Sequence, residues 1–339
     1  MHKPFSTCQS AGIIVEIGGN HEGNPEYAFR LIDKALKTGA KSIKFQSYTG
    51  NSLVNKEIDP DRARHFDKFA ISYDLQQEIA EYVIKKGGNF MSSLWDLESL
   101  EILDPFINIH KVGSGDLTNL PMISEICKTK KPLILSTAMS DLELISETVD
   151  FIKTNFPFYS KPNNLALLHC VAMYGDLNDA HANLGAIGDI RNKFPELVIG
   201  YSDHTLGVVA SIMSLALGAE IVEVHFTDDK TRDFRDHHLS LDPDELTLLI
   251  ESFERHKVIL GSKEKTIVQD IESPERIKEF RRSCYLNKNL KKGDIINELD
   301  LITLRPLKGI DAKNYFKLVG KKLKKDINKL DPLDWQDFE

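Results

Sequence analysis

Charged and polar side chains recur where short apolar runs of this chain end, and these residues could do chemistry. The earlier runs end in Glu16, in Lys44 and Gln46, in Ser93 and Trp95, and in Lys111, Ser114 and Asp116. The later runs end in Ser136, in His169 and Cys170, in Ser202 and His204, and in Glu223 and His225. A buried lysine or glutamate without a partner is costly. One shared polar pocket therefore explains the whole set.

Lys44 and Lys111 indicate what such a pocket would bind. Lysines, serine hydroxyls and exposed backbone N–H groups together suit a ligand that carries both a phosphate and a carboxylate. Another interpretation pairs these lysines with Glu16 or Glu223 in buried salt bridges. Each serine alone is also explained as a core hydroxyl with a satisfied hydrogen bond, whereas serines at four strand ends favour a ligand.

His204 and His225 end two consecutive runs. Neighbouring strands lie about 4.8 Å apart, so two imidazoles there can share one ion. Oxygen ligands would come from Asp236, Glu16 or water, and a nitrogen and oxygen set without thiolate favours Mn²⁺, with Mg²⁺ or Co²⁺ as alternatives, over structural zinc. The other interpretation is one catalytic and one core histidine. Cys170 has no base at a suitable spacing, so we do not expect a nucleophile there.

The apolar runs alternate eight times with amphipathic stretches of helical period. The predicted strands are 13–17, 42–46, 89–92, 110–112, 132–136, 165–170, 197–201 and 221–226, and the predicted helices are 25–38, 73–86, 97–103, 120–129, 141–155, 184–194, 206–217 and 244–260. Such continuous apolar runs are typical of buried parallel strands, and eight units in about 250 residues predict a (β/α)8 TIM barrel whose functional residues follow the strands. An open doubly wound sheet is the alternative, but no GxGxxG fingerprint follows the first strand.

The pattern changes after Gly261. We expect the barrel to occupy residues 1–261 and the charged stretch 262–280, with Ser273-Pro274, to be a linker. Residues 281–339 show short alternating runs around a Lys292-Gly293-Asp294 turn. They predict a separate small domain of mostly strand and turn.

Composition excludes several classes of protein. The 339 residues, 41% of them hydrophobic, can bury a large core, and no run approaches the length of about 18 apolar residues that a membrane span needs. The net charge of −8, with dispersed basic residues, argues against nucleic acid, and the basic run Lys321–Lys325 is expected to be a solvated face. The N-terminus lacks the apolar region of a signal peptide, and four scattered cysteines without CxxC spacing indicate reduced thiols, so we expect a cytoplasmic protein.

Nearly the whole chain resembles the bacterial sialic acid (N-acetylneuraminate) synthases and their nonulosonic acid relatives. The matching stretches are 16–21, 43–46, 111–119, 134–137, 168–170, 200–207, 223–227, 236–237 and 240–241. The last part resembles the antifreeze-like (SAF) domain of that family, with Arg281-Arg282-Ser283 leading into it and Leu304-Arg305-Pro306 as its substrate-reaching loop. Each stretch alone is modest, but their order and number are specific.

The resemblance implies a transferase that joins phosphoenolpyruvate to the open-chain aldehyde of an N-acetylated aminosugar, with a metal ion, and releases phosphate by C–O cleavage. The residues that it implies are Glu16, Lys44, Lys111 and Asp236 for catalysis, Gln46, Ser93, Trp95, Ser114, Asp116, Ser136, Tyr174, Ser202 and Arg305 for substrates, and His204 and His225 for the metal. It also implies a domain-exchanged homodimer, in which Arg305 completes the site of the partner subunit.

Three departures from the family pattern concern the sugar. Ala172 replaces a polar residue, Phe234-Arg235 replaces Gly-Pro before Asp236-His237, and Ser93 and Trp95 stand where Thr and Phe are common. The sugar therefore stays open between N-acetylmannosamine and a legionaminic, pseudaminic or other precursor. Two alternatives remain: a deoxy-octulosonate or deoxy-heptulosonate type of synthase, which needs a second basic cluster for a phosphorylated sugar, and a catalytically silent barrel that acts as a binding protein.

Overall fold

Eight parallel strands form a closed barrel in chain order. The structure is a computed structural model, and it describes residues 12–173, 179–233, 236–262, 264–268 and 270–339. The strands are β1 (Ile13–Glu16), β2 (Ser42–Ser47), β3 (Asn89–Leu94), β4 (His110–Val112), β5 (Leu133–Ser136), β6 (Leu165–Cys170), β7 (Val198–Asp203) and β8 (Val222–His225). Because β8 pairs with β1, the ring is complete. The predicted (β/α)8 barrel is confirmed, and the open doubly wound sheet is wrong.

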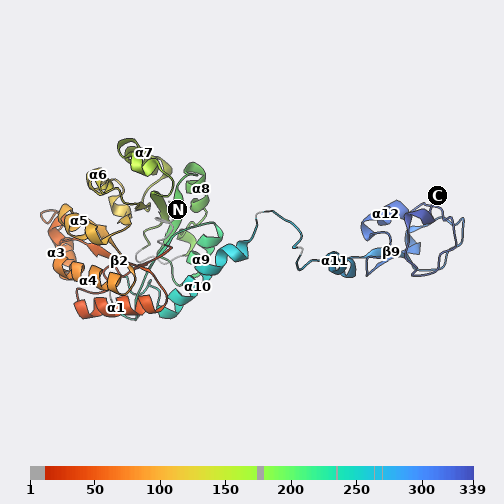
Figure 1. The fold of residues 1–339 in the computed structure, drawn as a ribbon, viewed down its shortest axis with the longest axis horizontal. Coiled ribbons are helices and arrows are strands. Elements are labelled where there is room, and N and C mark those ends of the chain that lie inside the picture. The colour runs from red at the N-terminus through yellow and green to blue at the C-terminus, as the bar shows by residue number, and fades with distance from the viewer. Residues whose placement is uncertain (1–11, 174–178, 234–235, 263, 269) are drawn as a thin grey trace. The chain divides into compact units, whose positions relative to one another are not determined.

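Helices follow the strands and surround the barrel (Figure 1). They are α1 (Pro25–Lys37), α4 (Tyr73–Lys85), α5 (Leu97–Leu103), α6 (Leu120–Lys128), α7 (Leu142–Asn155), α8 (Ala186–Lys193), α9 (Val209–Ala216) and α10 (Pro243–Leu260). All of them were predicted. Two further helices, α2 (Gly50–Leu53) and α3 (Pro60–Phe69), were not, because α2 is a single turn and α3 buries only Ala63 and Phe66.

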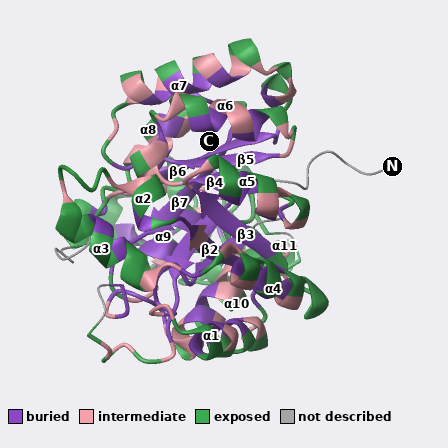
Figure 2. Ribbon diagram, turned by 90° about the vertical axis from the view of Figure 1, so that its left-hand side faces the viewer, coloured by how far each residue is buried: buried purple, intermediate pink, exposed green. Residues whose placement is uncertain are grey.

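The barrel is filled by an apolar layer with a polar layer above it. Side chains such as Ile14, Met91, Ile109, Ile134 and Ile221 form a separate buried cluster, while a larger core lies between the strands and the helices. The ribbon of the barrel strands is accordingly coloured mostly as buried in Figure 2. Alternate residues of a strand share a face. Each of these apolar residues therefore points to the same side as the residue two positions later, which is Glu16, Ser93, Lys111, Ser136 and Glu223 in turn. This alternation places the polar side chains inside the barrel, toward the carboxyl ends of its strands.

Gly200 in β7 is a position where only hydrogen fits. A Cβ atom there would lie 2.4 Å from the main-chain oxygen of Ile221 and 2.5 Å from a methyl carbon of Leu168. We expect Gly200→Ala to lower the free energy of unfolding by about 1–3 kcal/mol, measured by urea denaturation. Gly188→Ala in α8 is the control, because nothing lies within 4 Å of the added carbon there. Equal stability of the two variants would contradict this account.

The described residues from Ser262 onward form a second compact unit. Its β9 (Ser283–Leu286) and β10 (Leu301–Leu304) pair antiparallel, and with α12 (Tyr315–Leu318) they enclose a small core that includes Cys284 and Leu318. Helix α11 (Pro274–Phe280) lies in the stretch that we expected to be a linker. Ser273 accepts a hydrogen bond from the Arg276 N–H, so Ser273-Pro274 marks the start of a helix here.

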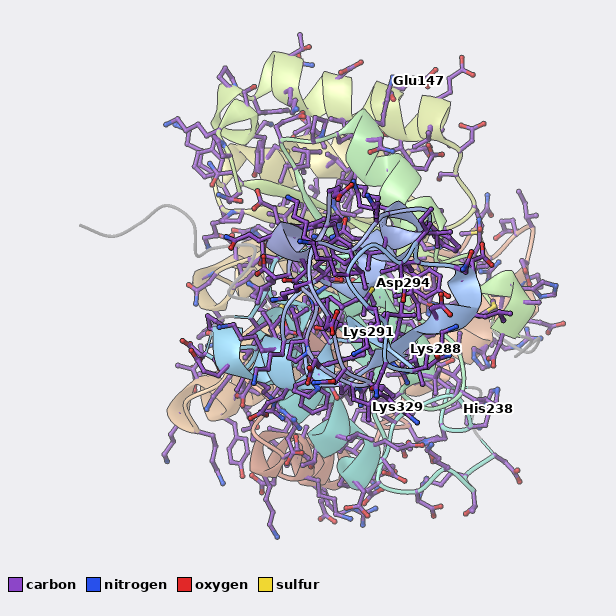
Figure 3. All side chains as sticks on the ribbon, turned by 90° about the vertical axis from the view of Figure 1, so that its right-hand side faces the viewer. Glu147, His238, Lys288, Lys291, Asp294 and Lys329 are labelled. Atoms are coloured by element: carbon purple, nitrogen blue, oxygen red, sulfur yellow. The ribbon has the colours of Figure 1, made fainter. Side chains whose placement is uncertain are left out.

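The surface of this second unit is rich in charge. Figure 3 labels Lys288, Lys291 and Lys329, which are all exposed. In the basic run, Lys322 pairs with Glu339 and Lys325 with Asp337, as in a solvated face. In the part of the chain that the structure describes, no helix combines the length and apolar character needed to cross a membrane.

Candidate active site

A cavity of about 670 Å³ opens where the barrel strands end. The structure brings together on its lining most of the residues that the sequence predicted: Glu16, Lys44, Gln46, Ser93, Trp95, Lys111, Ser114, Asp116, Ser136, Ser202, His204 and His225. Residues 16, 44, 93, 111, 202 and 225 come from six different strands. The cavity therefore exists only because the barrel collects these strand ends at one mouth.

Asp236 and Arg305 belong to other parts of the structure, and Tyr174 lies outside the described residues. Asp236 is 1% exposed, in the loop after β8, and does not line the cavity, although its charge acts to raise the pKa of His204. Arg305 is exposed on the second unit, with its guanidinium carbon 5.6 Å from the centre of the Phe280 ring.

Strand register sets which site residues are neighbours. Glu16 is opposite Lys44 on one side and opposite His225 on the other. In the same way Ser93 is opposite Lys111, and Ser202 is opposite Glu223. Paired residues on adjacent parallel strands lie side by side on the same face of the sheet, so Glu16 is flanked by Lys44 and His225 inside the barrel.

Two carboxylates hold the two lysines inside the barrel. Lys44 contacts Glu16 and lies 3.3 Å from one Glu223 oxygen, while Lys111 lies 3.1 Å from the other. Lys44 also donates to Ser93 at 3.2 Å, and Lys111 donates to the Ser136 hydroxyl at 2.7 Å. The salt-bridge interpretation of the lysines is therefore correct, and it is compatible with a shared pocket. The sequence did not predict that Glu223 contacts both lysines at once.

Burial and charge act against each other in this cluster. Burial lowers the pKa of Lys44 to about 8, although the Glu223 carboxylate acts to raise it. Burial raises the pKa of Glu223, but Lys111 and Lys44 together outweigh that effect, so the net pKa lies below its usual value. The Glu223 carboxylate therefore opposes the loss of a proton from Lys44 that burial favours. An anionic ligand that arrives can take over as the partner of the lysines.

His204 and His225 have ring centres 5.3 Å apart at the cavity wall, close enough to reach one ion. The Nδ1 atom of His204 lies 3.1 Å from the Val171 carbonyl oxygen, which can only accept, so Nδ1 carries the proton and Nε2 keeps its lone pair. Burial, followed by the charge of His225, lowers the pKa of His204 to about 4. A neutral imidazole with an oriented second nitrogen is the form that binds metal ions.

These two imidazoles would need further ligands. Among the residues that the structure describes, no three His, Cys, Asp or Glu side chains are arranged to hold a metal ion. Catalytic metal sites keep open positions for water or substrate, so a pair of histidines fits such a site and not a closed structural one. Cys170 lies 3.5 Å from His204 Nδ1, a neighbour that the spacing in the sequence did not indicate, and burial raises the pKa of its thiol to about 11.

The cavity lining also contains residues that the sequence did not indicate. These are Asn55, Asp59, Arg62 and Phe66, from α3 and the segment before it. They lie in the long connection between β2 and α4, away from any strand end. We predicted the inner residues from their positions at strand ends, and that criterion does not apply to residues in this connection.

The comparisons with known proteins agree with this geometry. The NeuB family matches residues 31–265, and the SAF domain matches residues 281–339. This chain belongs to the NeuB family. The resemblance drawn from the sequence is thereby confirmed, as is the expectation that the chain is an enzyme, a synthase of the transferase class.

Relatives of this NeuB-family chain match it over nearly its full length. It is 36% identical to an uncharacterised protein of Methanocaldococcus jannaschii, over 96% of this chain and 94% of that protein. It is 33% identical to the N,N'-diacetyllegionaminic acid synthase of Legionella pneumophila, over 99% of this chain and 97% of the relative. The crystal structure of the N-acetylneuraminic acid synthetase of Leptospira borgpetersenii superimposes with a TM-score of 0.70 at 29% identity, covering 80% of this chain and 92% of that one.

Proposed function

We propose that this NeuB-family chain condenses phosphoenolpyruvate with the open-chain aldehyde of an N-acetylated aminosugar and releases phosphate. The observation that carries the proposal is that Lys44 and Lys111 line the same cavity as His204 and His225. The names of the Legionella and Leptospira relatives, both synthases of sialic-type acids, support the same reaction class.

Phosphoenolpyruvate would bind through the buried lysines and the hydroxyls beside them. Its phosphate and carboxylate would replace the acidic side chains as partners of Lys44 and Lys111, with Ser93 and Ser136 already in contact with these ammonium groups. Ser114 and Ser202 would complete the anion site. The aminosugar would contact the remaining polar residues, which are Gln46, Trp95, Asp116, Tyr174, Asp236 and the Arg305 of a partner subunit.

His204 and His225 would hold the metal ion, with Mn²⁺ expected first and Mg²⁺ or Co²⁺ as alternatives. When bound, such an ion supplies Lewis-acid polarisation of a carbonyl oxygen. The protein side chains do the rest. Lys44 and Lys111 stabilise the charge that shifts through the enolpyruvyl group, and Glu16, buried beside Lys44, is our candidate for moving a proton.

The bonds change as follows in this proposal. C3 of phosphoenolpyruvate forms a bond to the aldehyde carbon, and the aldehyde oxygen takes up a proton. Water adds to C2 and loses a proton, and then the C2–O bond to phosphate breaks. Phosphate leaves and takes up the proton of the C2 hydroxyl, so that C2 becomes the ketone of the lengthened sugar acid.

The test uses the purified chain with phosphoenolpyruvate, Mn²⁺ and a panel of unphosphorylated six-carbon N-acetylated aminosugars. We expect phosphate release with at least one sugar, and a nine-carbon product whose mass equals that of the sugar plus pyruvate. Phosphate release without any sugar, or a product formed only from a phosphorylated sugar that carries no N-acetyl group, would contradict the proposal. The second result would favour the deoxy-octulosonate or deoxy-heptulosonate type of synthase.

We further propose that the chain forms a domain-exchanged homodimer, in which Arg305 reaches the sugar in the partner's cavity. Arg305→Ala should raise the KM for the aminosugar by about tenfold, the effect of losing one charged hydrogen bond, and leave the KM for phosphoenolpyruvate unchanged. Arg276→Ala is a matched control, because its guanidinium also lies beside Phe280, at 5.8 Å. Equal rises in both KM values would contradict the placement of Arg305.

Mixing a variant with a raised sugar KM and a variant without activity, assayed at a sugar concentration below the wild-type KM, tests the domain exchange itself. A chain with Arg305→Ala keeps an intact barrel, and a chain with Lys111→Met keeps an intact second unit. If the second unit serves the partner's barrel, mixed dimers contain one complete site and activity returns. If it serves its own barrel, the mixture stays as slow as the separate variants. We also propose a cytoplasmic location, because Cys127, Cys170 and Cys284 are free thiols.

A further inference from the structure

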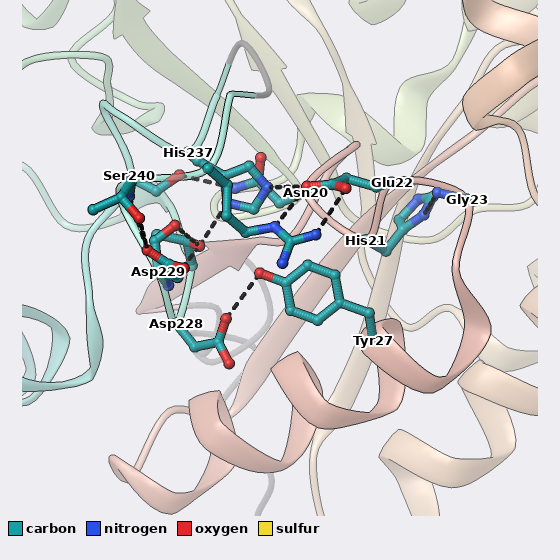
Figure 4. A network of polar contacts seen from close by, with 12 residues as sticks. Asn20, His21, Glu22, Gly23, Tyr27, Asp228, Asp229, His237 and Ser240 are labelled. Carbon is teal, nitrogen blue, oxygen red and sulfur yellow. Dashed lines mark hydrogen bonds and ion pairs between the residues drawn. The ribbon is translucent and has the colours of Figure 1, made fainter.

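A polar network, buried at Asn20, His237 and Ser240 and partly exposed at Glu22 and Arg232, joins the loop after β1 to the loop after β8 (Figure 4). Glu22, in the first loop, accepts hydrogen bonds from Arg232 Nε at 2.7 Å and Nη2 at 2.8 Å. It also faces His237 Nε2 at 3.1 Å. Arg232 and His237 flank Asp236 in the second loop. The Glu22 carboxylate thus bonds to Arg232 and faces His237. These two residues stand before and after Asp236, which we propose contacts the aminosugar.

His237 is fully buried, and both of its ring nitrogens have partners. Because a carboxylate only accepts, Nε2 must carry the proton that goes to Glu22, which leaves Nδ1 to accept from the Thr227 hydroxyl at 2.6 Å. The ring stacks nearly parallel to Tyr27, at an interplanar angle of 7°. Arg232 lies over the same Tyr27 ring at 4.5 Å. The imidazole therefore has one orientation in which all of its contacts are made.

The other side of Asp236 is held through its main chain. The Ser240 hydroxyl donates to the Asp236 carbonyl oxygen at 2.6 Å. The Asn20 amide donates to Ser240 Oγ and to the Phe226 carbonyl oxygen, both at 2.9 Å. Asn20 is fully buried and follows β1. The loop after β1 therefore bonds to the loop after β8 at two positions, Asn20 and Glu22. Asp236 lies in the chain between the residues to which these two bond.

Helix α1 also holds the loop after β8 in place through contacts with Asp228. Tyr27 donates from its hydroxyl to Asp228 at 2.8 Å, and Asp228 also pairs with Arg30 and Lys34 of the same helix. The loop after β8 is therefore anchored at its start, on both sides of Asp236 and through the rings of Tyr27 and His237. Buried polar networks of this kind define one conformation more than they add stability, because apolar side chains would fill the same space at less cost.

We propose that Glu22, His237 and Ser240 are positioning residues that fix the Asp236 carboxylate for contact with the aminosugar. The inference rests on the proposed function, because it takes Asp236 as the group that touches the sugar. Neither these three residues nor Asp236 line the cavity in this structure, although the charge of Asp236 acts on His204, which does line it. Their influence on catalysis must therefore pass through the loop.

The main variant is Glu22→Ala, compared with Glu22→Gln. We expect Glu22→Ala to raise the KM for the aminosugar by about tenfold, and to change the KM for phosphoenolpyruvate by less than about twofold. Glu22→Gln should recover most of the loss, since its carbonyl oxygen still accepts from His237. The matched control is Asp33→Ala in α1, which removes an exposed carboxylate that also bonds a tyrosine, Tyr82, and a cation, Lys86.

A double-mutant cycle tests whether Glu22 acts through Asp236. If it does, adding Glu22→Ala to Asp236→Asn should raise the sugar KM no further. Additive effects, or equal rises in both KM values, would overturn the inference. Should Glu22→Ala fold poorly, Ser240→Ala, which removes a single hydroxyl, replaces it in the same cycle with the same expected outcome.

Hydrogen exchange tests the positional part without any substrate. We expect the peptide that covers residues 227–241 to exchange faster in Glu22→Ala than in Asp33→Ala. Unchanged exchange there would overturn the inference, whatever the activity. An inactive wild-type chain with the expected exchange pattern would instead refute the proposed function alone.

Discussion

Replacing His225 by alanine is expected to abolish turnover while the barrel stays folded. His225 ends β8 opposite Glu16, and its ring centre lies 5.3 Å from that of His204, so it would be one of two imidazoles on the metal ion. Loss of that ion would remove the polarisation of the aldehyde, and we expect phosphate release to fall by about a thousandfold. Mn²⁺ binding, measured by calorimetry, should weaken in parallel.

A second buried histidine provides the control for this prediction. His110 in β4 is also fully buried, but its Nε2 lies 2.9 Å from Asp104, and it does not line the cavity. We expect His110→Ala to lower stability and to leave Mn²⁺ affinity and the kcat of folded protein unchanged. Wild-type activity in His225→Ala would rule out the metal assignment.

Lys111→Met is expected to remove both activity and stability, for different reasons. Activity should fall by about a thousandfold, because one of the two cations that stabilise the enolpyruvyl anion is gone. The free energy of unfolding should fall by about 3 kcal/mol, because the buried Glu223 carboxylate loses the Lys111 partner that lay 3.1 Å away. Phosphate release and urea denaturation measure the two losses separately.

The double variant Lys111→Met with Glu223→Leu separates the two effects. Removing the carboxylate as well as the ammonium leaves no unpaired charge at this position, so most of the lost stability should return. Activity should not return, since the cation is still missing. A double variant that regains both would show that Lys111 serves only to balance Glu223, and the proposed anion site would be wrong.

The sequence was sufficient to predict the barrel and the inner site, because both depend on one repeated pattern. Apolar runs alternating with amphipathic stretches define the strands, and a polar residue at the end of each run marks the mouth. Lys111 and Ser136 illustrate this, since they end consecutive strands and form a 2.7 Å hydrogen bond. Their closeness follows from strand order alone.

Other parts of the site depend on side-chain contacts that no local pattern encodes. Glu223 could be placed at a strand end, but not between two particular lysines, because that choice depends on rotamers and register. Arg62 and Phe66 reach the mouth from a helix that the sequence did not predict. Glu22 and His237 are far apart in the chain, and nothing in the residues around either one indicates the other.

The pairing of β1 with β8 has a consequence for how this enzyme acquires activity. Glu16 and His225 face each other only through that last strand pair, so no partial barrel, however helical, contains the site. Contacts between distant parts of a chain form late and slowly in folding. When the urea-unfolded chain is diluted into buffer, helical circular dichroism should therefore recover first, and the ability to consume substrate should follow after a lag.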